Sequence, residues 1–469
     1  TLLEFFKIND PFRMIGILIL FILLQTPYYL MEIPTLQPEF IWKLLGQQIN
    51  SGDIPYVAII DNTGPLSAMV YWFNDILFSN SWLSFRMIAS AIIFFQVFYT
   101  NHMFIENNAY DESNYLPAFF MLLLYQLSFD FMTLSPALMG STFVLLALSK
   151  LLSQTSVNTN TVPSVLLMGI YAGIAFCFHF PYLLFLPLLI FSGLLINGFS
   201  FQQLALILTA FLLPTAFCAL FFFWHDALSN FIEMYFTLAL KLEKIYHVTY
   251  KDLGYIFMLP LLIAIMGYLK NNILRRLTVN QQKQNQLFLL FLIFNIGMFF
   301  LMDRVSPFQF ISIIPVLTYF ITHFFSIAKT KLVQNVLGYS LFLILPLMGY
   351  SWTFYLLNDN SFSSYKLENV GTYGIPDNEK VMVLGNDLAP YQHTNMASPY
   401  LNFRLTEIYF EKMGQMQRKT RFYRDLKKEQ PTIIIDEAGV FDDWVKDLPK
   451  IKPLYTRSNN GLIYRGNQE

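Results

Sequence analysis

Four acidic residues lie within a stretch of thirty near the start of the chain: Glu32, Glu39, Asp53 and Asp61. Carboxylates grouped in this way can accept a proton from a nucleophile or bind a divalent cation. Loops also carry acidic residues that have no chemical role, so the spacing alone leaves both interpretations open. The elements on either side of this stretch decide what the carboxylates face.

The sequence lacks the fingerprints of several soluble enzyme classes. It contains no phosphate-binding glycine loop, no zinc-type spacing of His and Cys, and no serine-hydrolase elbow. The two cysteines, Cys177 and Cys218, fall in apolar segments and are predicted to be small core residues rather than a disulfide or a metal pair. The net charge is −1, and no run of basic residues indicates a nucleic-acid partner.

The composition predicts a polytopic α-helical membrane protein. Hydrophobic residues make up 55% of the 469 residues and charged residues only 13%, about half the charged fraction of a soluble protein. Apolar stretches of roughly 17–25 residues, long enough to cross a bilayer as helices, recur along most of the chain. About eleven spans are expected, at residues 14–30, 83–101, 115–133, 137–153, 164–180, 181–197, 203–224, 252–269, 286–302, 306–327 and 334–356.

Basic loops predict the orientation of these spans. Lys7 and Arg13 precede the first span, and residues 270–276 and 329–331 are the most basic short loops, so all three are expected in the cytoplasm. The amino terminus is then cytoplasmic and the carboxyl terminus is extracytoplasmic. Residues 64–78 and 229–246 become helices on the outer membrane surface, with a short tilted span at 64–78 as the alternative. The short loops suit a bacterial inner membrane with a periplasmic tail, and an endoplasmic-reticulum membrane is the alternative.

A small α/β domain is predicted after the last span. The composition becomes polar beyond Leu357, and a strand at 381–384 is followed by helices at 399–413 and 418–428 and a strand at 432–435. This order favours a parallel strand pair, which short strands near Leu454 and Leu462 would complete. The predicted domains are therefore a transmembrane domain at 1–357, with a structured first outer loop at 32–80, and an extracytoplasmic α/β domain at 358–469.

Two short motifs lie in the predicted first outer loop, SGDIP at residues 51–55 and DNTGPL at residues 61–66. Both are similar to the first outer loop of the GT-C glycosyltransferase superfamily, in particular of protein O-mannosyltransferases and lipid A aminoarabinose transferases. Residues 85–90 (FRMIAS) resemble its arginine at the start of the second span, and residues 304–317 resemble its late Arg-to-Pro-x-Leu span. The likeness extends over nearly the whole chain, through motifs that are each short and degenerate.

The sequence departs from this group where its catalytic acids are expected. Gln37-Pro38 occupies that position, and an amide cannot accept a proton near neutral pH. The resemblance implies that Glu39 or Glu32 takes the catalytic role with support from Asp61, or that the site is inactive. The group's histidine in the DNTGPL element is Thr63 here.

The resemblance implies transfer of a sugar from a polyprenyl phosphate to a protein or lipid acceptor at the outer face of the membrane. Arg86, Arg304 and His179 are the expected partners of the lipid phosphate. Snorkelling to headgroups is the alternative for the arginines, and a hydrogen bond between helices is the alternative for His179. Asp130 is expected to cap the helix that follows it or to lie in the headgroup layer.

Two other functions remain open at the level of the sequence. The first is a catalytically silent relative whose outer loop and tail bind other envelope proteins as a scaffold. The second is a transporter, which is disfavoured because no inverted repeat or pair of broken spans is evident. Membrane lipid is an expected partner, and no nucleic-acid partner is expected. The need for a divalent cation is left open.

Overall fold

The computed structural model forms two compact units that interleave along the chain. Unit 1 comprises residues 1–34, 81–218 and 244–362, and unit 2 comprises residues 35–80, 219–243 and 363–469. The structure describes residues 2–31, 33, 35–79, 81–155, 162–274, 276–326, 331–359, 362, 364–367, 374–446, 448, 451–458 and 462–466.

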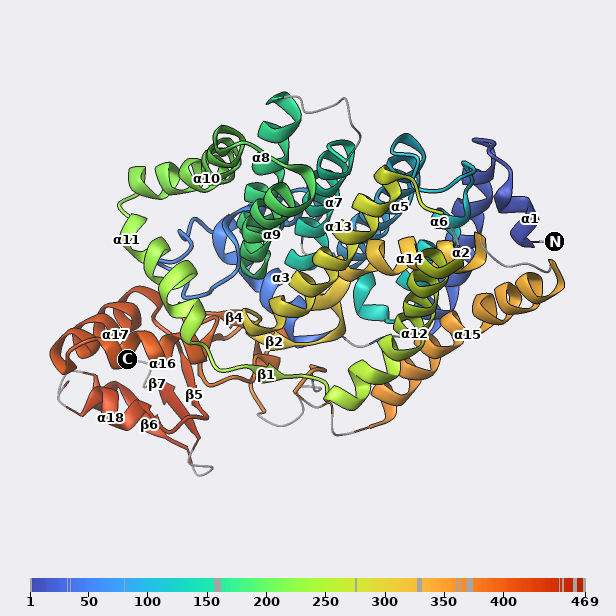
Figure 1. Cartoon of the computed structure of the whole chain (residues 1–469). Coiled ribbons are helices and arrows are strands. Elements are labelled where there is room, and N and C mark those ends of the chain that lie inside the picture. The colour runs from blue at the N-terminus through green and yellow to red at the C-terminus, as the bar shows by residue number, and fades with distance from the viewer. Residues whose placement is uncertain are drawn as a thin grey trace. The chain divides into compact units, whose positions relative to one another are not determined.

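Unit 1 is a bundle of long apolar helices (Figure 1). Among the described residues, nine helical segments are long and apolar enough to cross a membrane, and two shorter apolar helices, α6 and α8, accompany them. The helices with most of their residues in this unit are α1 (Leu2–Lys7), α2 (Arg13–Leu30), α5 (Trp82–Glu106), α6 (Leu116–Tyr125), α7 (Pro136–Ser153), α8 (Val162–Phe178), α9 (Phe185–Ser192), α10 (Phe201–Trp224), α12 (Tyr250–Leu274), α13 (Val279–Gly297), α14 (Ile314–Ser326) and α15 (Lys331–Asn358). Each predicted span overlaps one of these segments, so the prediction of a polytopic helical membrane protein is confirmed.

One predicted span is shorter than expected. The apolar run at 115–133 is α-helical only through α6, and a 3-10 turn, η1 (Phe129–Met132), follows it. The next helix, α7, begins at Pro136 because the side chain of Ser135 accepts a hydrogen bond from the Leu138 backbone N–H at 3.0 Å. Polar residues and a proline therefore interrupt the apolar run.

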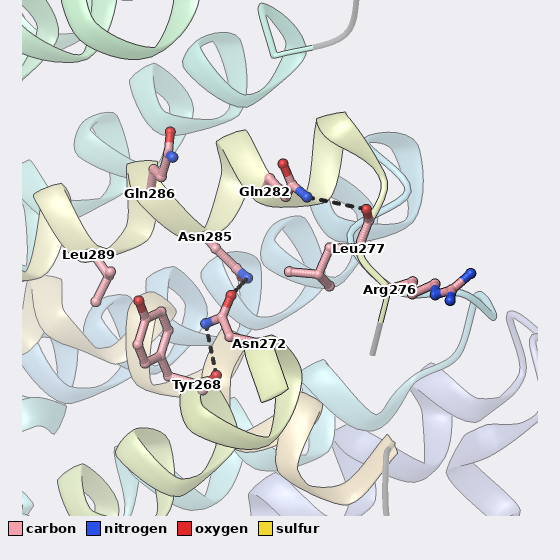
Figure 2. Close-up of a pocket in the computed structure, with 8 residues that line it drawn as sticks. All are labelled: Tyr268, Asn272, Arg276, Leu277, Gln282, Asn285, Gln286 and Leu289. Carbon is pink, nitrogen blue, oxygen red and sulfur yellow. Dashed lines mark hydrogen bonds between the residues drawn. The ribbon is translucent and has the colours of Figure 1, made fainter. Parts of the chain in front are cut away.

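Helices α12 and α13 form a hairpin that positions two regions discussed below. At one end, Arg276 and Leu277 precede α13 (Figure 2). At the other end, β1 (Ile245–Tyr246) precedes α12 and pairs in parallel with β2 (Arg304–Val305), which follows α13. Because α12 has 25 residues, these two ends are separated by about 37 Å of helix.

Unit 2 joins the first loop to the carboxyl-terminal segment. Helices α3 (Gln37–Asn50) and α4 (Pro65–Phe78) pack closely at Gly46. A Cβ at this position would lie only 2.6 Å from the Tyr71 carbonyl oxygen, so the close approach requires glycine. Helix α4 has 14 residues, fewer than a perpendicular span needs. Its position on the membrane surface stays a prediction.

The carboxyl-terminal segment contains a mixed sheet (Figure 1, red). Among the described residues the strand order is β4-β3-β5-β7-β6, with β3 (Lys380–Leu384) parallel to β5 (Ile433–Asp436), as predicted. The other members of this segment are β4 (Asn395–Met396), β6 (Tyr455–Arg457), β7 (Ile463–Gly466), α16 (Phe403–Lys412), α17 (Gln415–Glu429) and α18 (Phe441–Val445). The ring of Trp444 in α18 packs against Phe410 of α16 and Phe422 of α17, which holds the three helices together. The prediction of a small α/β fold at the end of the chain is confirmed.

The helix expected at 229–246 is shorter and less regular than predicted. The structure has α11 (Leu228–Phe231), a π-helical turn η4 (Ile232–Leu238) and a 3-10 turn η5 (Ala239–Lys241). Residues 245–246 instead form β1, since their backbone pairs with β2. The regular α-helical pattern therefore ends much earlier than the apolar periodicity suggests.

Candidate functional site

Two of the predicted catalytic carboxylates are buried in unit 2 around one tyrosine. Glu39 on α3 is 5% exposed and Asp61, just before α4, is 3% exposed. Burial raises the pKa of the Tyr71 hydroxyl well above its ordinary value, and the charges of Asp61 and then Glu39 raise it further. The tyrosine therefore stays protonated at neutral pH, and both carboxylates lie within electrostatic range of its hydroxyl.

A lysine also belongs to this cluster. Lys43 lies one helical turn after Glu39 on α3, so the two side chains share a helix face. Burial lowers the pKa of Lys43 to about 8, although the charges of Glu39 and Asp75 oppose the decrease. The ammonium of Lys43 can thus lose its proton near neutral pH. The i, i+4 spacing from Glu39 is the sequence signal that could have identified it.

The loop between α3 and α4 is held in a specific conformation. Tyr56 has a left-handed backbone conformation, with φ at +68°, which is unfavourable for an aromatic residue. Its hydroxyl donates to the Thr63 carbonyl at 2.5 Å, and its ring contacts Phe231 with a centroid distance of 5.4 Å. The Asp61 carboxylate accepts a hydrogen bond from the Thr63 backbone N–H at 3.0 Å. These contacts fix the position of Asp61 relative to its loop.

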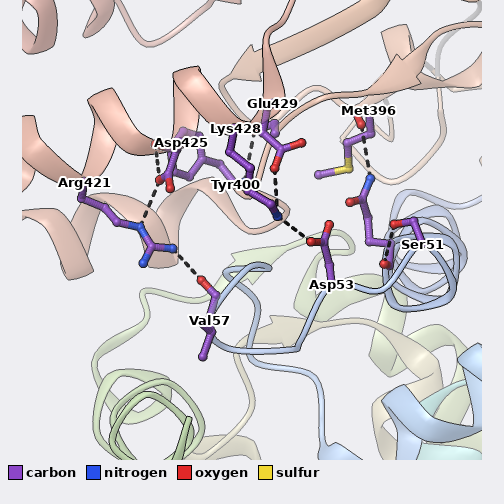
Figure 3. A network of polar contacts seen from close by, with 11 residues as sticks. Ser51, Asp53, Val57, Met396, Tyr400, Arg421, Asp425, Lys428 and Glu429 are labelled. Carbon is purple, nitrogen blue, oxygen red and sulfur yellow. Dashed lines mark hydrogen bonds and ion pairs between the residues drawn. The ribbon is translucent and has the colours of Figure 1, made fainter. Parts of the chain in front are cut away.

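Helix α17 binds this loop through charged groups (Figure 3). Lys428 donates to the Asp53 carboxylate at 2.6 Å. Arg421 donates from Nη2 to the Val57 carbonyl at 2.5 Å and from Nε to Asp425 at 3.1 Å. The first loop and the carboxyl-terminal helices therefore form one structural unit.

Backbone hydrogen bonds join the same two segments. The Ile60 N–H donates to the Pro399 carbonyl at 2.7 Å, and the Asn402 N–H donates to the Ile60 carbonyl at 3.0 Å. Gln37, which stands where the resemblance places an acid, donates from its side chain to the Asn386 carbonyl at 2.6 Å. Gln37 thus binds the carboxyl-terminal segment.

A polar cluster in unit 1 contains two of the predicted phosphate-binding residues. His179 follows α8, and Arg304 lies in β2, and each is 8% exposed. The ring of His179 lies close to Asp303 and Gln309, and Arg304 Nε is 3.8 Å from the Asp303 carboxylate. These residues all lie at the β1–β2 end of the α12–α13 hairpin.

The polar side chains of this cluster are buried. The side chains of His179 and Gln309 interact with one another, and Ser306 Oγ is buried without a hydrogen-bond partner within the part of the chain that the structure describes. Buried polar groups in native proteins are nearly always paired, so the Ser306 hydroxyl is a candidate contact for water or a polar ligand.

Asp130 stabilises the segment next to this cluster. Its carboxylate accepts a hydrogen bond from the Phe308 backbone N–H at 3.1 Å, at the start of the 3-10 helix η7 (Pro307–Ile313). The sequence suggested a cap on the helix after Asp130, but Ser135 caps that helix, and Asp130 binds a segment 178 residues away.

The remaining predicted site residues are less closely grouped. Arg86 in α5 is partly buried and donates from Nη2 to the Ile33 carbonyl at 3.3 Å. Glu32 lies outside the described residues. Within each unit, the structure thus groups Glu39 with Asp61 and His179 with Arg304. Whether any of them acts in catalysis stays a prediction.

Among the described residues, no group of three or more His, Cys, Asp or Glu side chains could hold a metal ion.

Fold and site together define a multi-pass membrane protein with an α/β segment that binds the loop after its first span. Solved structures share this fold over nearly the whole chain. The structure of ArnT from Cupriavidus metallidurans bound to undecaprenyl phosphate has a TM-score of 0.57 and 12% identity, covering 97% of this chain and 99% of that one.

An archaeal protein gives the same result. The oligosaccharyltransferase of Archaeoglobus fulgidus, tethered to an acceptor peptide, has a TM-score of 0.53 and 10% identity and covers 98% of this chain and 74% of that one. The complex of AglB from the same organism with an inhibitory peptide and a dolichol-phosphate has a TM-score of 0.50 at 11% identity and covers 98% and 75% of the two chains. No family model and no curated protein sequence matches the chain. The chain therefore has the GT-C fold, as its motifs suggested, and these identities establish the fold alone.

Proposed function

We propose that this protein transfers a sugar from a polyprenyl-phosphate donor to a protein or lipid acceptor at the extracytoplasmic face of a bacterial inner membrane. The observation that carries the proposal is the burial of Glu39 and Asp61 around Tyr71, in the first loop of a chain with a GT-C fold. Structural neighbours bound to undecaprenyl phosphate or dolichol-phosphate support a lipid-linked donor.

Unit 2 is proposed to act on the acceptor. An acceptor hydroxyl or amine attacks the anomeric carbon of the sugar, and the Glu39 carboxylate accepts the proton that the acceptor loses. Asp61 is proposed as a second carboxylate that supports the role of Glu39. Lys43 is part of this cluster, because the charge of Glu39 raises its pKa against the effect of burial.

Unit 1 is proposed to bind the donor. As the new glycosidic bond forms, the bond between the anomeric carbon and the phosphate oxygen breaks, and polyprenyl phosphate leaves with one additional negative charge. Arg304 and His179 are proposed to stabilise that charge, with Arg86 as a further cation. The buried hydroxyl of Ser306, which has no hydrogen-bond partner among the described residues, supports a polar ligand here. Glu32 is the alternative base.

A transfer assay tests the proposal. Purified full-length protein in proteoliposomes would receive radiolabelled sugars linked to undecaprenyl phosphate, with cell-envelope proteins and lipids as acceptors. We expect transfer by the wild type and a decrease of about 100-fold or more in Glu39→Gln, because a general base contributes at least this factor. Glu411→Gln, an exposed change on α16, serves as the control.

The scaffold alternative predicts the opposite result. Absence of transfer from every donor, together with unchanged cell phenotypes in Glu39→Gln and Asp61→Asn, would refute the enzymatic function. Stable co-purification of envelope proteins with an inactive protein would then support a scaffold.

A further inference from the structure

A polar pocket lies at the end of the α12–α13 hairpin that is remote from Arg304. Its volume is about 470 Å³. Half of the eight side chains that line it are carboxamides, and a tyrosine, an arginine and two leucines complete the lining: Asn272, Gln282, Asn285, Gln286, Tyr268, Arg276, Leu277 and Leu289. Neither the catalytic carboxylates nor the proposed donor cations line this pocket.

Hydrogen bonds hold the pocket in shape. Figure 2 shows Asn285 of α13 and Asn272 of α12 pointing toward one another, with the ring of Tyr268 beside them. Asn285 Nδ2 lies 3.4 Å from Asn272 Oδ1, and Asn272 Nδ2 donates to the Tyr268 carbonyl at 2.9 Å. The hydroxyl of Tyr319 donates to Asn285 Oδ1 at 2.8 Å. One amide on each helix, Asn272 and Asn285, is thus held in place.

The segment that contributes to the pocket is basic in sequence. Residues 270–283 include four basic residues and no acidic residue, although the Asp111 carboxylate accepts a hydrogen bond from the neighbouring Gln281 side chain at 3.2 Å. One of these, Arg276, is exposed on the connecting loop and lines the pocket. A guanidinium group is suited to a phosphate, because it can donate two parallel hydrogen bonds to its oxygens.

Apolar surface adjoins this polar pocket. Ile273 is 75% exposed, Val279 is 62% exposed and Ile293 is 63% exposed on the two helices that form it. Side chains of this kind on spanning helices face lipid tails. A ligand with a polar head and acyl chains therefore fits these surroundings better than a fully soluble one.

We propose that this pocket binds the headgroup of an anionic glycerophospholipid whose phosphodiester is followed by hydroxyl groups, of the phosphatidylglycerol type. Arg276 binds the phosphate, and the carboxamides of Gln282 and Gln286 hydrogen-bond the hydroxyls. The acyl chains lie along the exposed apolar faces of α12 and α13. This lipid site is independent of the proposed sugar transfer, since it lies about 37 Å along α12 from β1.

Native mass spectrometry of the purified full-length protein tests the proposal. The protein would be titrated with phosphatidylglycerol and with phosphatidylcholine that carries the same acyl chains. We expect phosphatidylglycerol to bind about tenfold more tightly, and Arg276→Gln to remove most of this preference. Lys283→Gln is the matched control, because it removes the same charge from the same segment but does not line the pocket. We expect it to change the preference less than about threefold.

Three results would overturn the proposal. Equal losses in Arg276→Gln and Lys283→Gln would show attraction to surface charge only. Equal binding of the two lipids would exclude headgroup recognition. Binding of glycerol phosphate as tight as that of phosphatidylglycerol would indicate a soluble phosphate ligand instead of a lipid. Gln286→Ala, at an exposed position, gives a second variant that is not expected to disturb folding, and it should weaken phosphatidylglycerol binding severalfold.

Discussion

Replacing Arg421 by glutamine should weaken the attachment of helix α17 to the first loop. The side chain of Arg421 is 17% exposed and that of Asp425 is 8% exposed, so their ion pair is largely shielded from water. The variant loses the 3.1 Å bond to Asp425 and the 2.5 Å bond to the Val57 carbonyl. Hydrogen bonds to charged groups contribute roughly 1.5–3 kcal/mol each, and breaking a buried pair costs roughly 3–5 kcal/mol. We expect a loss of about 3 kcal/mol in the local free energy of opening, because the pair is not fully buried.

Hydrogen exchange measured by mass spectrometry reports this loss directly. A change of about 3 kcal/mol corresponds to amide exchange in α17 that is about 100-fold faster. Arg424→Gln is the control, since Arg424 is an exposed residue on the same helix and carries the same charge.

The effect of Arg421→Gln should depend on pH. Burial raises the pKa of the Asp425 carboxyl above its ordinary value, and Arg421 opposes this rise. Without Arg421 the pKa rises further, so the folded form binds a proton more readily than the unfolded form. The group then stabilises the folded form more as the pH falls. The difference between wild type and Arg421→Gln should therefore decrease as the pH falls. Exchange no faster than in Arg424→Gln, or a difference that does not change with pH, would refute the described contact.

Three further predictions concern the two candidate sites. Gly46→Ala should destabilise the packing of α3 on α4 by roughly 1–3 kcal/mol, measured by thermal unfolding, because the added Cβ would lie 2.6 Å from the Tyr71 carbonyl oxygen. The pH midpoint for reductive methylation of Lys43 should lie near 8. Glu39→Gln should lower this midpoint, since the Glu39 charge raises the pKa of Lys43. An unchanged midpoint would show that Glu39 has no electrostatic effect on Lys43. Arg304→Gln should weaken binding of undecaprenyl phosphate about tenfold by native mass spectrometry, and unchanged binding would exclude Arg304 from the donor site.

The sequence predicted the spans well because their signal is local. An apolar run of sufficient length must be a helix in lipid, whatever surrounds it. The parallel pairing of β3 with β5 was also predictable, because two helices lie between these strands along the chain. Local signals failed where the chain departs from a regular helix, as at η4 and β1.

Which segments of the chain combine to form unit 2 could not be predicted in the same way. The bond between Arg421 and Val57 joins residues 364 positions apart, and the bond between Lys428 and Asp53 joins residues 375 apart. No periodic pattern encodes such contacts. The lowered pKa of Lys43 likewise follows from burial that only the folded structure reveals.

The rate of sugar loss from a polyprenyl-phosphate donor in a single turnover tests the central claim most directly. The assay would compare wild type with Glu39→Gln at saturating donor and acceptor, with donor binding measured in parallel. The proposed mechanism predicts a rate about 100-fold lower in the variant and unchanged donor affinity, because Glu39 accepts the acceptor's proton and does not hold the phosphate. Equal rates in the two proteins would contradict the role of Glu39, and no sugar loss in either would contradict the transfer itself.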